Sequence, residues 1–343
     1  MKVRITSLNP TEIATELGLQ PFQGRQVFRW LHQKHVFDFE AMTDLSKELR
    51  KELAERAMTS QLTLAHLSTS ARSFGTRKAL FRLEDGETVE AVLIRDRDRA
   101  TICLSTQVGC AVKCAFCATG MSGYTRNLNP GEIVEQALYL LKEEGIEDGH
   151  PNIVYMGMGE PFRNYDATVR SVRLLMARQG LGIGARRITV STVGEVPGIR
   201  QFAEEGWQIR LSISLHAANN ALRSKLVPIN RKYPLETLMS AVRDYVNATR
   251  RHVTFEWALL NDVNDSPRDA AELAELVSDL QATVNLIPYN PIPEAGFAPP
   301  PFAKCEAFRD ALLKRSVNTT LRKERGQDIN AACGQLRRQL LSA

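Results

Sequence analysis

The chain has 343 residues, of which 43% are hydrophobic and 24% charged, a composition typical of a globular protein with one large domain and a small one. No run of about 18 apolar residues occurs, so we expect no membrane span, and the start of the sequence lacks the long apolar stretch of a secretory signal. Six cysteines, three of them clustered, favour a reducing cytoplasm and metal or catalytic use over a disulfide framework.

Residues 1–66 are predicted to form a small helical module. Asn9 is a candidate cap for the first helix, and a second helix is expected over 24–33. Thr43 and Ser46 begin a third helix, in which leucines repeat every four residues. The module carries nine basic and eight acidic side chains, so its charge alone does not predict contact with nucleic acid.

Residues 67–100 change to the two-residue period of strands and are predicted to form a β extension. A strand over 78–83, a turn at 85–86 and a strand over 88–94 predict a hairpin. A further strand over 101–106 leads directly into a loop with three cysteines.

Strands and helices alternate along the rest of the chain. Strands are expected over 152–156, 187–192, 209–215, 253–259, 283–288 and 317–322. Helices are expected over 130–144, 165–179, 196–205, 234–249, 267–280 and 302–314. Repeated strand–helix units imply parallel strands with right-handed crossovers, and six units are too few for a closed eight-stranded barrel. The predicted fold class is therefore α/β, with a partial (β/α)6-type barrel over 101–343 and its chemistry at the C-terminal ends of the strands.

Three cysteines, Cys110, Cys114 and Cys117, lie on one tight loop after the 101–106 strand. Three thiolates can hold a [4Fe–4S] cluster and leave one iron without a protein ligand. A zinc site would also want a fourth ligand, and no Cys or His occurs from Ala118 until His150. We therefore expect a substrate or cofactor to complete the site. The alternatives are a zinc loop completed by a distant residue and three unrelated buried cysteines.

The C-x3-C-x2-C spacing, with Phe116 before the last cysteine, resembles the signature of radical S-adenosylmethionine (SAM) enzymes. In that superfamily the amino and carboxylate groups of SAM bind the open iron. The resemblance implies one [4Fe–4S] cluster per chain, held by Cys110, Cys114 and Cys117, and by itself it leaves the reaction open.

Polar residues also follow the other predicted strands. Gly157 and Gly159 would let the backbone approach a ligand, and Glu160 offers a carboxylate beside them. Alone this segment could be an ordinary turn, but beside a radical-SAM cysteine loop it resembles the element that binds the SAM amino group. The residues at other strand ends are Ser191, Ser214, Leu215, His216 and Asn290, and a single His or Asn is more often a structural residue than a ligand contact.

Three cysteines lie outside the cluster loop. Cys305 falls among apolar residues of a predicted helix, so we expect it in the core. Cys103 lies on the strand that enters the cysteine loop, and Cys333 lies beside Gly334. For Cys103 and Cys333, the sequence leaves a reactive thiol and a buried thiol equally open.

Several segments together resemble the RlmN/Cfr family of radical-SAM RNA adenosine methyltransferases. They span 22–30, 42–46, 107–120, 155–161, 214–217, 227–230 and 328–336, so the resemblance covers nearly the whole chain. RlmN-type members methylate C2 of adenosine 2503 in 23S rRNA and of adenosine 37 in tRNA, whereas Cfr-type members methylate C8 of the same rRNA nucleotide. Pro161 and Pro288 resemble the RlmN type.

The resemblance also implies a reaction that uses two molecules of SAM. One methylates Cys333, and the second yields a 5′-deoxyadenosyl radical that takes a hydrogen from this methyl group. The carbon radical then adds to the adenine, and Cys103 helps resolve the adduct as a Cys103–Cys333 disulfide forms. Such a route is reasonable because an aromatic ring carbon of adenine is not nucleophilic, and a cofactor radical supplies the missing reactivity.

The remaining site residues follow from the same resemblance. Glu90 is implied as the base for the ring proton, although without the family it could be a solvent-facing strand carboxylate. SAM is implied to contact Gly159, Glu160, Ser191, Ser214, Leu215, His216 and Asn290. The implied partners are 23S rRNA, tRNA and an electron donor for the cluster and the disulfide, and we expect a cytoplasmic monomer.

The charge of the chain is unevenly distributed. Residues 163–251 contain 15 basic and 6 acidic side chains, so this segment carries +9 and the remainder −4. It fits contact with RNA, and it equally fits solvated helices. If this segment lies along the RNA, reversing the charge at Arg223 and Lys225 should weaken RNA binding and spare SAM binding. A non-catalytic RNA-binding protein with a structural metal, and a radical-SAM enzyme with another target, are the rival functions.

Overall fold

The structure, a computed structural model, describes residues 2–96, 99–144, 151–323 and 325–337. His150, the first Cys or His after Cys117 and so a possible fourth metal ligand, lies outside these residues. The last residues of the predicted barrel domain also lie outside them. Within the described ranges, none of the helices has both the length and the apolar character that crossing a membrane requires.

The predicted N-terminal helices are confirmed. They are α1 (Pro10–Leu17), α2 (Pro21–His32) and α3 (Lys47–Arg56). The side chain of Asn9 accepts hydrogen bonds from the first turn of α1, while Glu12 bonds back to the Asn9 amide. Ser46 caps α3 in the same way through the amide of Leu49. A short parallel pair, β1 (Val3–Arg4) with β2 (Ala57–Met58), brings the two ends of this module together.

An antiparallel arm follows the helical module. It consists of β3 (Leu62–Thr69), β4 (Arg77–Leu83) and β5 (Thr88–Asp96), and β5 pairs in turn with β6 (Arg99–Cys103). The predicted hairpin is β4–β5 and is confirmed. The expectation of helix up to residue 66 is wrong, because β3 begins at Leu62. The local sequence does not predict β3, because buried and exposed residues alternate poorly along the strand. Its pairing with β4 also contains a bulge between Leu64 and His66.

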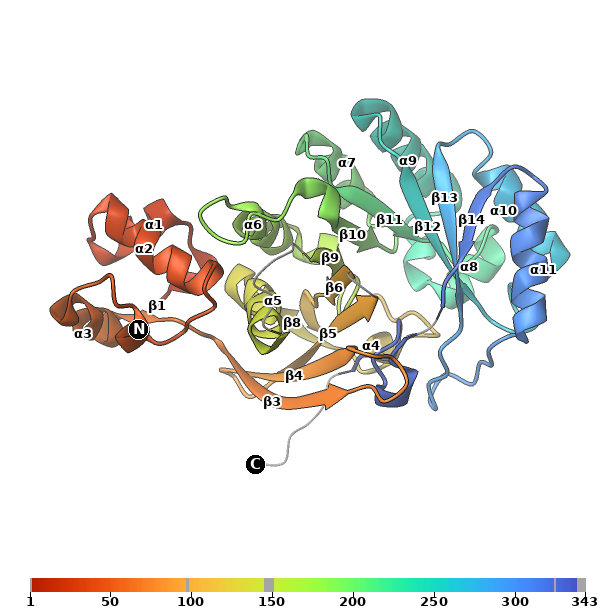
Figure 1. Cartoon of the computed structure of the whole chain (residues 1–343). Coiled ribbons are helices and arrows are strands. Elements are labelled where there is room, and N and C mark those ends of the chain that lie inside the picture. The colour runs from red at the N-terminus through yellow and green to blue at the C-terminus, as the bar shows by residue number, and fades with distance from the viewer. Residues whose placement is uncertain (1, 97–98, 145–150, 324, 338–343) are drawn as a thin grey trace.

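From β9 onward the strands run parallel to one another and to β6 in one sheet (Figure 1). They are β9 (Asn152–Tyr155), β10 (Ile188–Thr192), β11 (Arg210–Ser214), β12 (Val253–Leu259), β13 (Ala282–Pro288) and β14 (Asn318–Leu321). Ile102, Ile153 and Ile188 lie side by side on β6, β9 and β10, and all three are fully buried. The complete ten-stranded order runs from β14 to β3, so the predicted partial, open barrel is confirmed.

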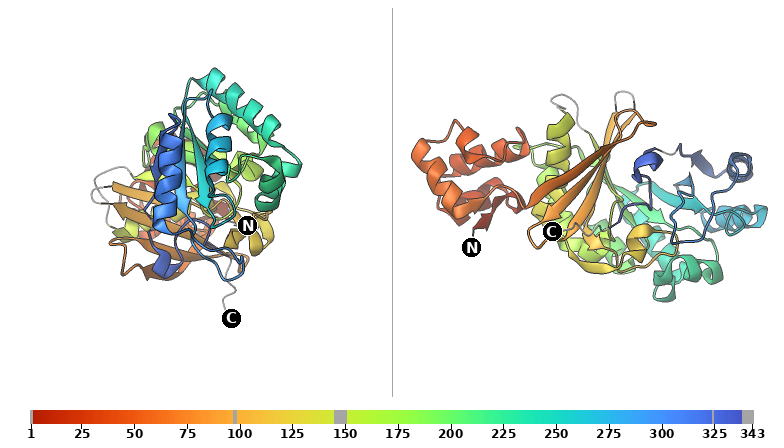
Figure 2. Two further views of the ribbon diagram at one scale, coloured as in Figure 1. Left: turned by 90° about the vertical axis from the view of Figure 1, so that its right-hand side faces the viewer. Right: turned by 90° about the horizontal axis from the view of Figure 1, so that it is seen from below.

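All six predicted crossover helices are present. They are α5 (Pro130–Glu144), α6 (Tyr165–Met176), α7 (Val196–Glu204), α9 (Leu235–Thr249), α10 (Pro267–Leu276) and α11 (Phe302–Leu313). A further helix, α8 (Asn220–Leu226), was not predicted. The views in Figures 1 and 2 place the N-terminal helices at one end of the molecule and α11 at the other.

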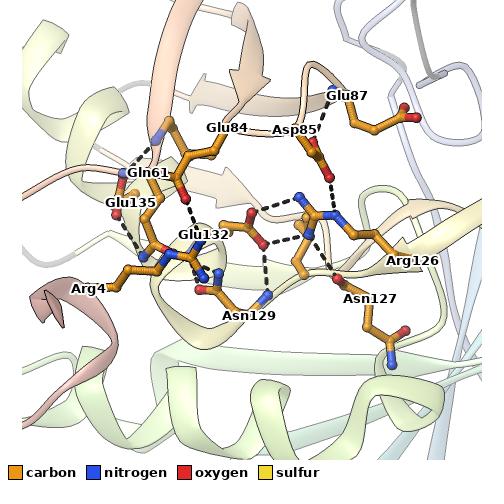
Figure 3. A network of polar contacts seen from close by, with 12 residues as sticks. Arg4, Gln61, Glu84, Asp85, Glu87, Arg126, Asn127, Asn129, Glu132 and Glu135 are labelled. Carbon is orange, nitrogen blue, oxygen red and sulfur yellow. Dashed lines mark hydrogen bonds and ion pairs between the residues drawn. The ribbon is translucent and has the colours of Figure 1, made fainter. Parts of the chain in front are cut away.

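The N-terminal module is joined to the barrel through the buried carboxylate of Glu135 on α5. This carboxylate accepts hydrogen bonds from the Thr6 hydroxyl at 2.5 Å and the Gln61 amide at 2.8 Å. Burial raises the pKa of Glu135 to about 7, although its hydrogen bonds act in the opposite direction. In the same region Arg126 bridges Asp85, in the β4–β5 turn, and Glu132 on α5 (Figure 3). The arm and the helical module are therefore both fastened to α5.

Candidate functional site

The cysteine loop, residues 110–117, is enclosed by a small hairpin that was not predicted. Its strands are β7 (Gln107–Gly109) and β8 (Tyr124–Asn127). A side chain on Gly109 would begin 1.9 Å from the Gly123 carbonyl oxygen, so only glycine allows the strands to close here. Directly after Cys117, the short helix α4 (Ala118–Met121) begins. The loop is thus held at both ends before any ligand is considered.

The three cysteines of this loop lie close enough to influence one another's ionisation. Burial raises the pKa of Cys110 to about 12, and burial together with the neighbouring thiols raises the pKa of Cys114. Both thiols therefore keep their protons until a metal displaces them. Cys117 lies at the wall of an adjoining cavity.

The donor set fits a [4Fe–4S] cluster. All three donors are thiols, and each can bind a different iron, so the sulfurs need not converge on one point. A mononuclear zinc site needs that convergence. Over the described ranges, no three His, Cys, Asp or Glu side chains are arranged around a single ion.

A first cavity lies against the cysteine loop at the C-terminal ends of the strands. It is lined by six of the seven residues predicted to contact SAM, namely Gly159, Glu160, Ser191, Ser214, His216 and Asn290. Glu256 and Tyr289 also line it, and in the described structure the Glu256 Oε2 atom and the Tyr289 hydroxyl are buried without hydrogen-bond partners. A polar ligand such as SAM fits this cavity because it could satisfy them.

Glu160 is presented by a backbone that only glycine permits. Gly159 has a φ of +103°, and a Cβ there would lie 2.7 Å from the side chain of Gln107. The Glu160 carboxylate accepts hydrogen bonds from the amides of Phe162 and Val193 at 3.0 and 2.9 Å. Burial outweighs these bonds and raises the pKa of Glu160 to about 7. A cationic amine in the cavity would favour the ionised form.

Neutral donors line the other side of this cavity. The Nδ1 atom of His216 accepts from the Ala258 amide at 2.9 Å, which places the imidazole proton on Nε2. Burial, assisted by Arg223, lowers the pKa of His216 to about 3, so the ring stays neutral. The hydroxyls of Ser191 and Ser214 lie 3.4 Å apart. These groups can donate to ligand oxygens and add no charge.

The C-terminal loop, residues 326–337, carries Cys333 to the edge of the first cavity. The Asn290 side chain donates to the Cys333 carbonyl at 3.2 Å. Gly334 follows with a φ of +84°, and its carbonyl accepts from the Ala118 amide at 2.8 Å. Cys333 is therefore fixed between the end of β13 and the helix that follows Cys117.

The far end of this loop is fastened to the arm. The Asp328 carboxylate accepts from the Ser70 hydroxyl at 2.7 Å and from the Ala71 amide at 2.9 Å. In addition, the amide of Gly326 donates to the Ser73 hydroxyl at 3.1 Å. The β3–β4 turn thus supports the loop that holds Cys333.

Cys333 also lines a second cavity, which contains Cys103 at the end of β6. Both thiols are free, and Cys333 is exposed. Burial and then the charge of Cys333 raise the pKa of Cys103 to about 12. Although the Cys333 residue as a whole is exposed, the protein atoms around its thiol raise the pKa of that thiol, whereas Arg322 opposes this shift. Arg322 lines both cavities, so the two extra-loop thiols share one cationic neighbour.

The structure bears on three sequence expectations about individual residues. Leu215 is buried and does not line the first cavity; its carbonyl accepts from Arg223. Arg223 is itself fully buried, so the expectation that it contacts RNA is wrong, whereas Lys225 is exposed. Cys305 is buried in the core, as predicted.

Glu90 is fully buried, which excludes the alternative of a solvent-facing strand carboxylate. It forms an ion pair with Lys78 at 2.9 Å and accepts from the Arg337 amide at 2.9 Å. It lines neither of the two cavities described above. Lys78 in turn reaches the Asn330 carbonyl at 3.4 Å, so this buried pair also holds the C-terminal loop.

Comparisons with known proteins agree with this geometry. Residues 104–274 match the profile of the radical SAM superfamily, and residues 8–59 match that of the ribosomal RNA large subunit methyltransferase N-terminal domain. Proteins named probable dual-specificity RNA methyltransferase RlmN are 46% identical in Desulfitobacterium hafniense (strain Y51) and 47% in Thermotoga maritima. These alignments cover 96% and 95% of this chain and 94% of each relative.

A solved structure is similar over almost its whole length. The crystal structure of a radical SAM methyltransferase from Sphaerobacter thermophilus is 47% identical and superposes with a TM-score of 0.95. The match covers 98% of this chain and 99% of that one. From the cysteine loop, the open barrel, the N-terminal domain and these relatives, we conclude that the chain belongs to the RlmN family of radical-SAM RNA methyltransferases.

Proposed function

We propose that this protein methylates C2 of adenine at adenosine 2503 of 23S rRNA and at adenosine 37 of tRNA. The observation that carries the proposal is the position of Cys333 in the wall between two cavities. One cavity adjoins the cysteine loop and holds the predicted SAM residues, and the other contains Cys103. A methyl group on Cys333 could therefore face SAM on one side and a nucleobase on the other.

The side chains of the first cavity are suited to hold SAM. The Glu160 carboxylate would receive the SAM amino group, while Ser191, Ser214, His216 and Asn290 would supply polar contacts around the rest of the molecule. A [4Fe–4S] cluster on Cys110, Cys114 and Cys117, once bound and reduced, would supply the electron for reductive cleavage of SAM. The surrounding apolar side chains would exclude water from the reactive species.

Cys103 and Cys333 are proposed to act in sequence. Cys333 first accepts a methyl group and later carries the carbon that is bonded to the RNA. The Cys103 thiolate then attacks the Cys333 sulfur, the sulfur–carbon bond breaks, and the electron pair of that bond passes to the carbon, which takes up a proton. Cys103 and Cys333 end as a disulfide, so an electron donor must reduce this bond before another turnover.

Glu90 is the proposed acceptor of the proton that leaves the adenine ring. In the described structure its carboxylate is engaged by Lys78 and by the amide of Arg337. Action on RNA therefore requires the segment around Arg337 to move when the substrate binds. This requirement connects proton removal to the same loop that presents Cys333.

Cations near the second cavity are proposed to guide the RNA backbone. Arg322, Lys323 and Arg325 line this cavity, and Lys323 is exposed. We propose that RNA also contacts the N-terminal module 1–66 and the exposed part of the basic segment 163–251. Binding should then weaken as salt rises, with a slope of about 0.7–0.9 per phosphate contact. The protein would act as a monomer in the cytoplasm, where its RNA substrates are found.

The reaction can be tested with anaerobically prepared protein. It is incubated with SAM, a reductant and fragments of 23S rRNA or tRNA, and the nucleosides are analysed by mass spectrometry. We expect 2-methyladenosine in both RNAs. 8-Methyladenosine in the rRNA would instead identify a Cfr-type enzyme, and no modified nucleoside in either RNA would contradict the proposal.

A further inference from the structure

A fully buried guanidinium lies next to the cysteine loop and has no place in the roles described so far. Arg223 belongs to α8, the helix that the sequence did not predict, and none of its surface is exposed. Transferring a charged side chain into the interior is costly unless another charge compensates for it. The neighbours of Arg223 therefore decide what the residue does.

The hydrogen-bond partners of Arg223 are all uncharged. Its guanidinium donates to the carbonyls of Leu215, Val193 and Ser214 at 3.1, 2.6 and 3.4 Å. It also donates to the Asn230 side-chain oxygen at 2.9 Å. These bonds engage all three guanidinium nitrogens but leave the positive charge unbalanced. In the part of the chain that the structure describes, no carboxylate forms an ion pair with Arg223.

The cysteine loop, which would become anionic when its thiolates bind a metal, adjoins this charge. The Ala115 amide, one residue after Cys114, donates to the Leu226 carbonyl at the end of α8 at 2.9 Å. Cys114 also packs in one apolar cluster with Leu226 and Val227. The electrostatic interaction of Arg223 with the Cys114 thiol favours the thiolate. Helix α8 thus carries a buried cation directly to the place where metal-bound thiolates would lie.

We propose that Arg223 is the counter-charge of the iron–sulfur cluster and makes the cluster easier to reduce. This inference rests on the proposed function, because it assumes a cluster on the three loop cysteines. Three thiolates outweigh the two positive charges of an oxidised [4Fe–4S] core, so the assembled site is anionic. Reduction adds another negative charge, which a nearby cation in a medium of low dielectric constant stabilises.

The proposal explains why an arginine stands at this position. The planar guanidinium can bond to several carbonyls at once, and it keeps its charge when it is buried. Its contacts with Val193 and Ser214 also fix it to two strand ends that line the first cavity. Arg223 is therefore a positioning residue: it acts on the cluster through its charge and touches neither SAM nor RNA.

The test compares three variants of the full-length protein after anaerobic cluster reconstitution. Arg223→Gln removes the charge but keeps a hydrogen-bonding group, whereas Arg223→Lys keeps the charge. Lys225→Gln removes an exposed charge from the same helix and is the matched control. The cluster midpoint potential is measured by redox titration. The rise in melting temperature on reconstitution is measured as a second readout that does not depend on turnover.

We expect Arg223→Gln to lower the ratio of reduced to oxidised cluster about tenfold at a fixed potential, which is a shift of 59 mV for a one-electron couple. Its stabilisation by the cluster should shrink as well, because the stabilisation that a ligand gives increases with the logarithm of its affinity. Arg223→Lys should retain most of both quantities. Lys225→Gln should change the ratio less than twofold, because solvent screens an exposed charge.

Several results would overturn the inference. A wild-type potential in Arg223→Gln, equal losses in the Gln and Lys variants, or an equal shift in Lys225→Gln would each show that the charge of Arg223 is not responsible. If Arg223→Gln binds no iron, the Lys variant decides: iron retained by Lys supports the proposal, and iron lost from both contradicts it. A wild-type protein that assembles no reducible cluster would refute the proposed function itself.

Discussion

The cysteine loop and the C-terminal loop both bring thiols to the first cavity, but they are held in opposite ways. The cysteine loop closes between β7 and β8, and Cys114 is buried against α8. The C-terminal loop is fastened by hydrogen bonds to distant parts of the chain, at Asn290 and at Ser70, and it leaves Cys333 exposed. Packing fixes one set of thiols, while polar contacts on either side hold the other in an accessible position.

This difference matches the proposed work of the two loops. Thiols that retain a resident cluster gain from burial and from a rigid frame, because exposure would allow exchange and oxidation. A thiol that meets SAM and then a nucleobase must remain accessible from both cavities. The comparison therefore predicts that changes in the cysteine loop remove the cluster, whereas changes at Cys333 stop a later step of the reaction.

The largest effect is expected from the cysteine loop. Cys114→Ala should remove one cluster ligand, and with it iron binding and nearly all reductive cleavage of SAM. Iron analysis and chromatographic detection of 5′-deoxyadenosine measure both losses. Cys305→Ala is the matched control, because that buried thiol lies in α11 and should affect stability only. Normal 5′-deoxyadenosine production by Cys114→Ala would show that the loop does not hold the cluster.

Changes to the other two thiols should stop turnover at separate stages. Cys333→Ala should prevent formation of methylated protein, since the methyl acceptor is missing. Cys103→Ala should allow the earlier steps and then accumulate RNA attached through Cys333, because the attacking thiol is absent. A denaturing gel detects this product as a band that contains both protein and RNA. Normal turnover by Cys103→Ala would remove Cys103 from the resolving step.

The polar fastening of the C-terminal loop can be tested at Lys78. Lys78→Met removes the ion pair between Lys78 and the buried Glu90 carboxylate, and breaking a buried pair costs about 3–5 kcal/mol. Urea denaturation should show a decrease of about this size in the free energy of unfolding. The double variant Lys78→Met/Glu90→Gln should recover much of the stability and still lack methyl transfer if Glu90 accepts the ring proton. Full activity of the double variant would exclude that role.

The smallest expected effect concerns the pH dependence of SAM binding at Glu160. Because burial raises its pKa to about 7, Glu160 stabilises the free protein at pH values below about 4.5, and this contribution is lost as the pH rises through about 7. SAM should favour the ionised carboxylate and release a proton on binding. Its affinity should increase about tenfold from pH 6 to pH 8. Calorimetry in two buffers measures both quantities, and Glu160→Gln should abolish the pH dependence.

Much of the barrel could be predicted from the sequence because its elements carry local signals. Asn9 and Ser46 cap their helices with side chains that the sequence shows directly. The β12 strand is buried at all but one of its positions, as expected for a parallel strand covered on both faces, and five of its seven residues are apolar. The spacing of the three cysteines predicted a metal site with an open position, and the resemblance to the radical-SAM signature indicated which metal group it holds.

The parts that were missed depend on contacts between distant residues. The β7–β8 hairpin contains only three and four residues in its two strands, and Gly109 is needed because Gly123 approaches it from across the loop. Arg223 belongs to a basic segment, and nothing in its immediate sequence shows that α8 turns it into the interior. Glu90 is likewise buried through contacts with Lys78 and Arg337, which come from different parts of the chain. The sequence therefore did not predict which single polar residues are buried, and the structure shows it.

The attachment of Asp328 to the β3–β4 turn has a consequence for how the protein is made. The partners of this carboxylate, Ser70 and Ala71, precede it by more than 250 residues. Synthesis proceeds from the N-terminus, and early segments can fold while later ones are still being added. The arm and the barrel strands can therefore be in place before residues 326–337 leave the ribosome. The reactive thiol is then positioned after the strands and helices that supply the other walls of both cavities.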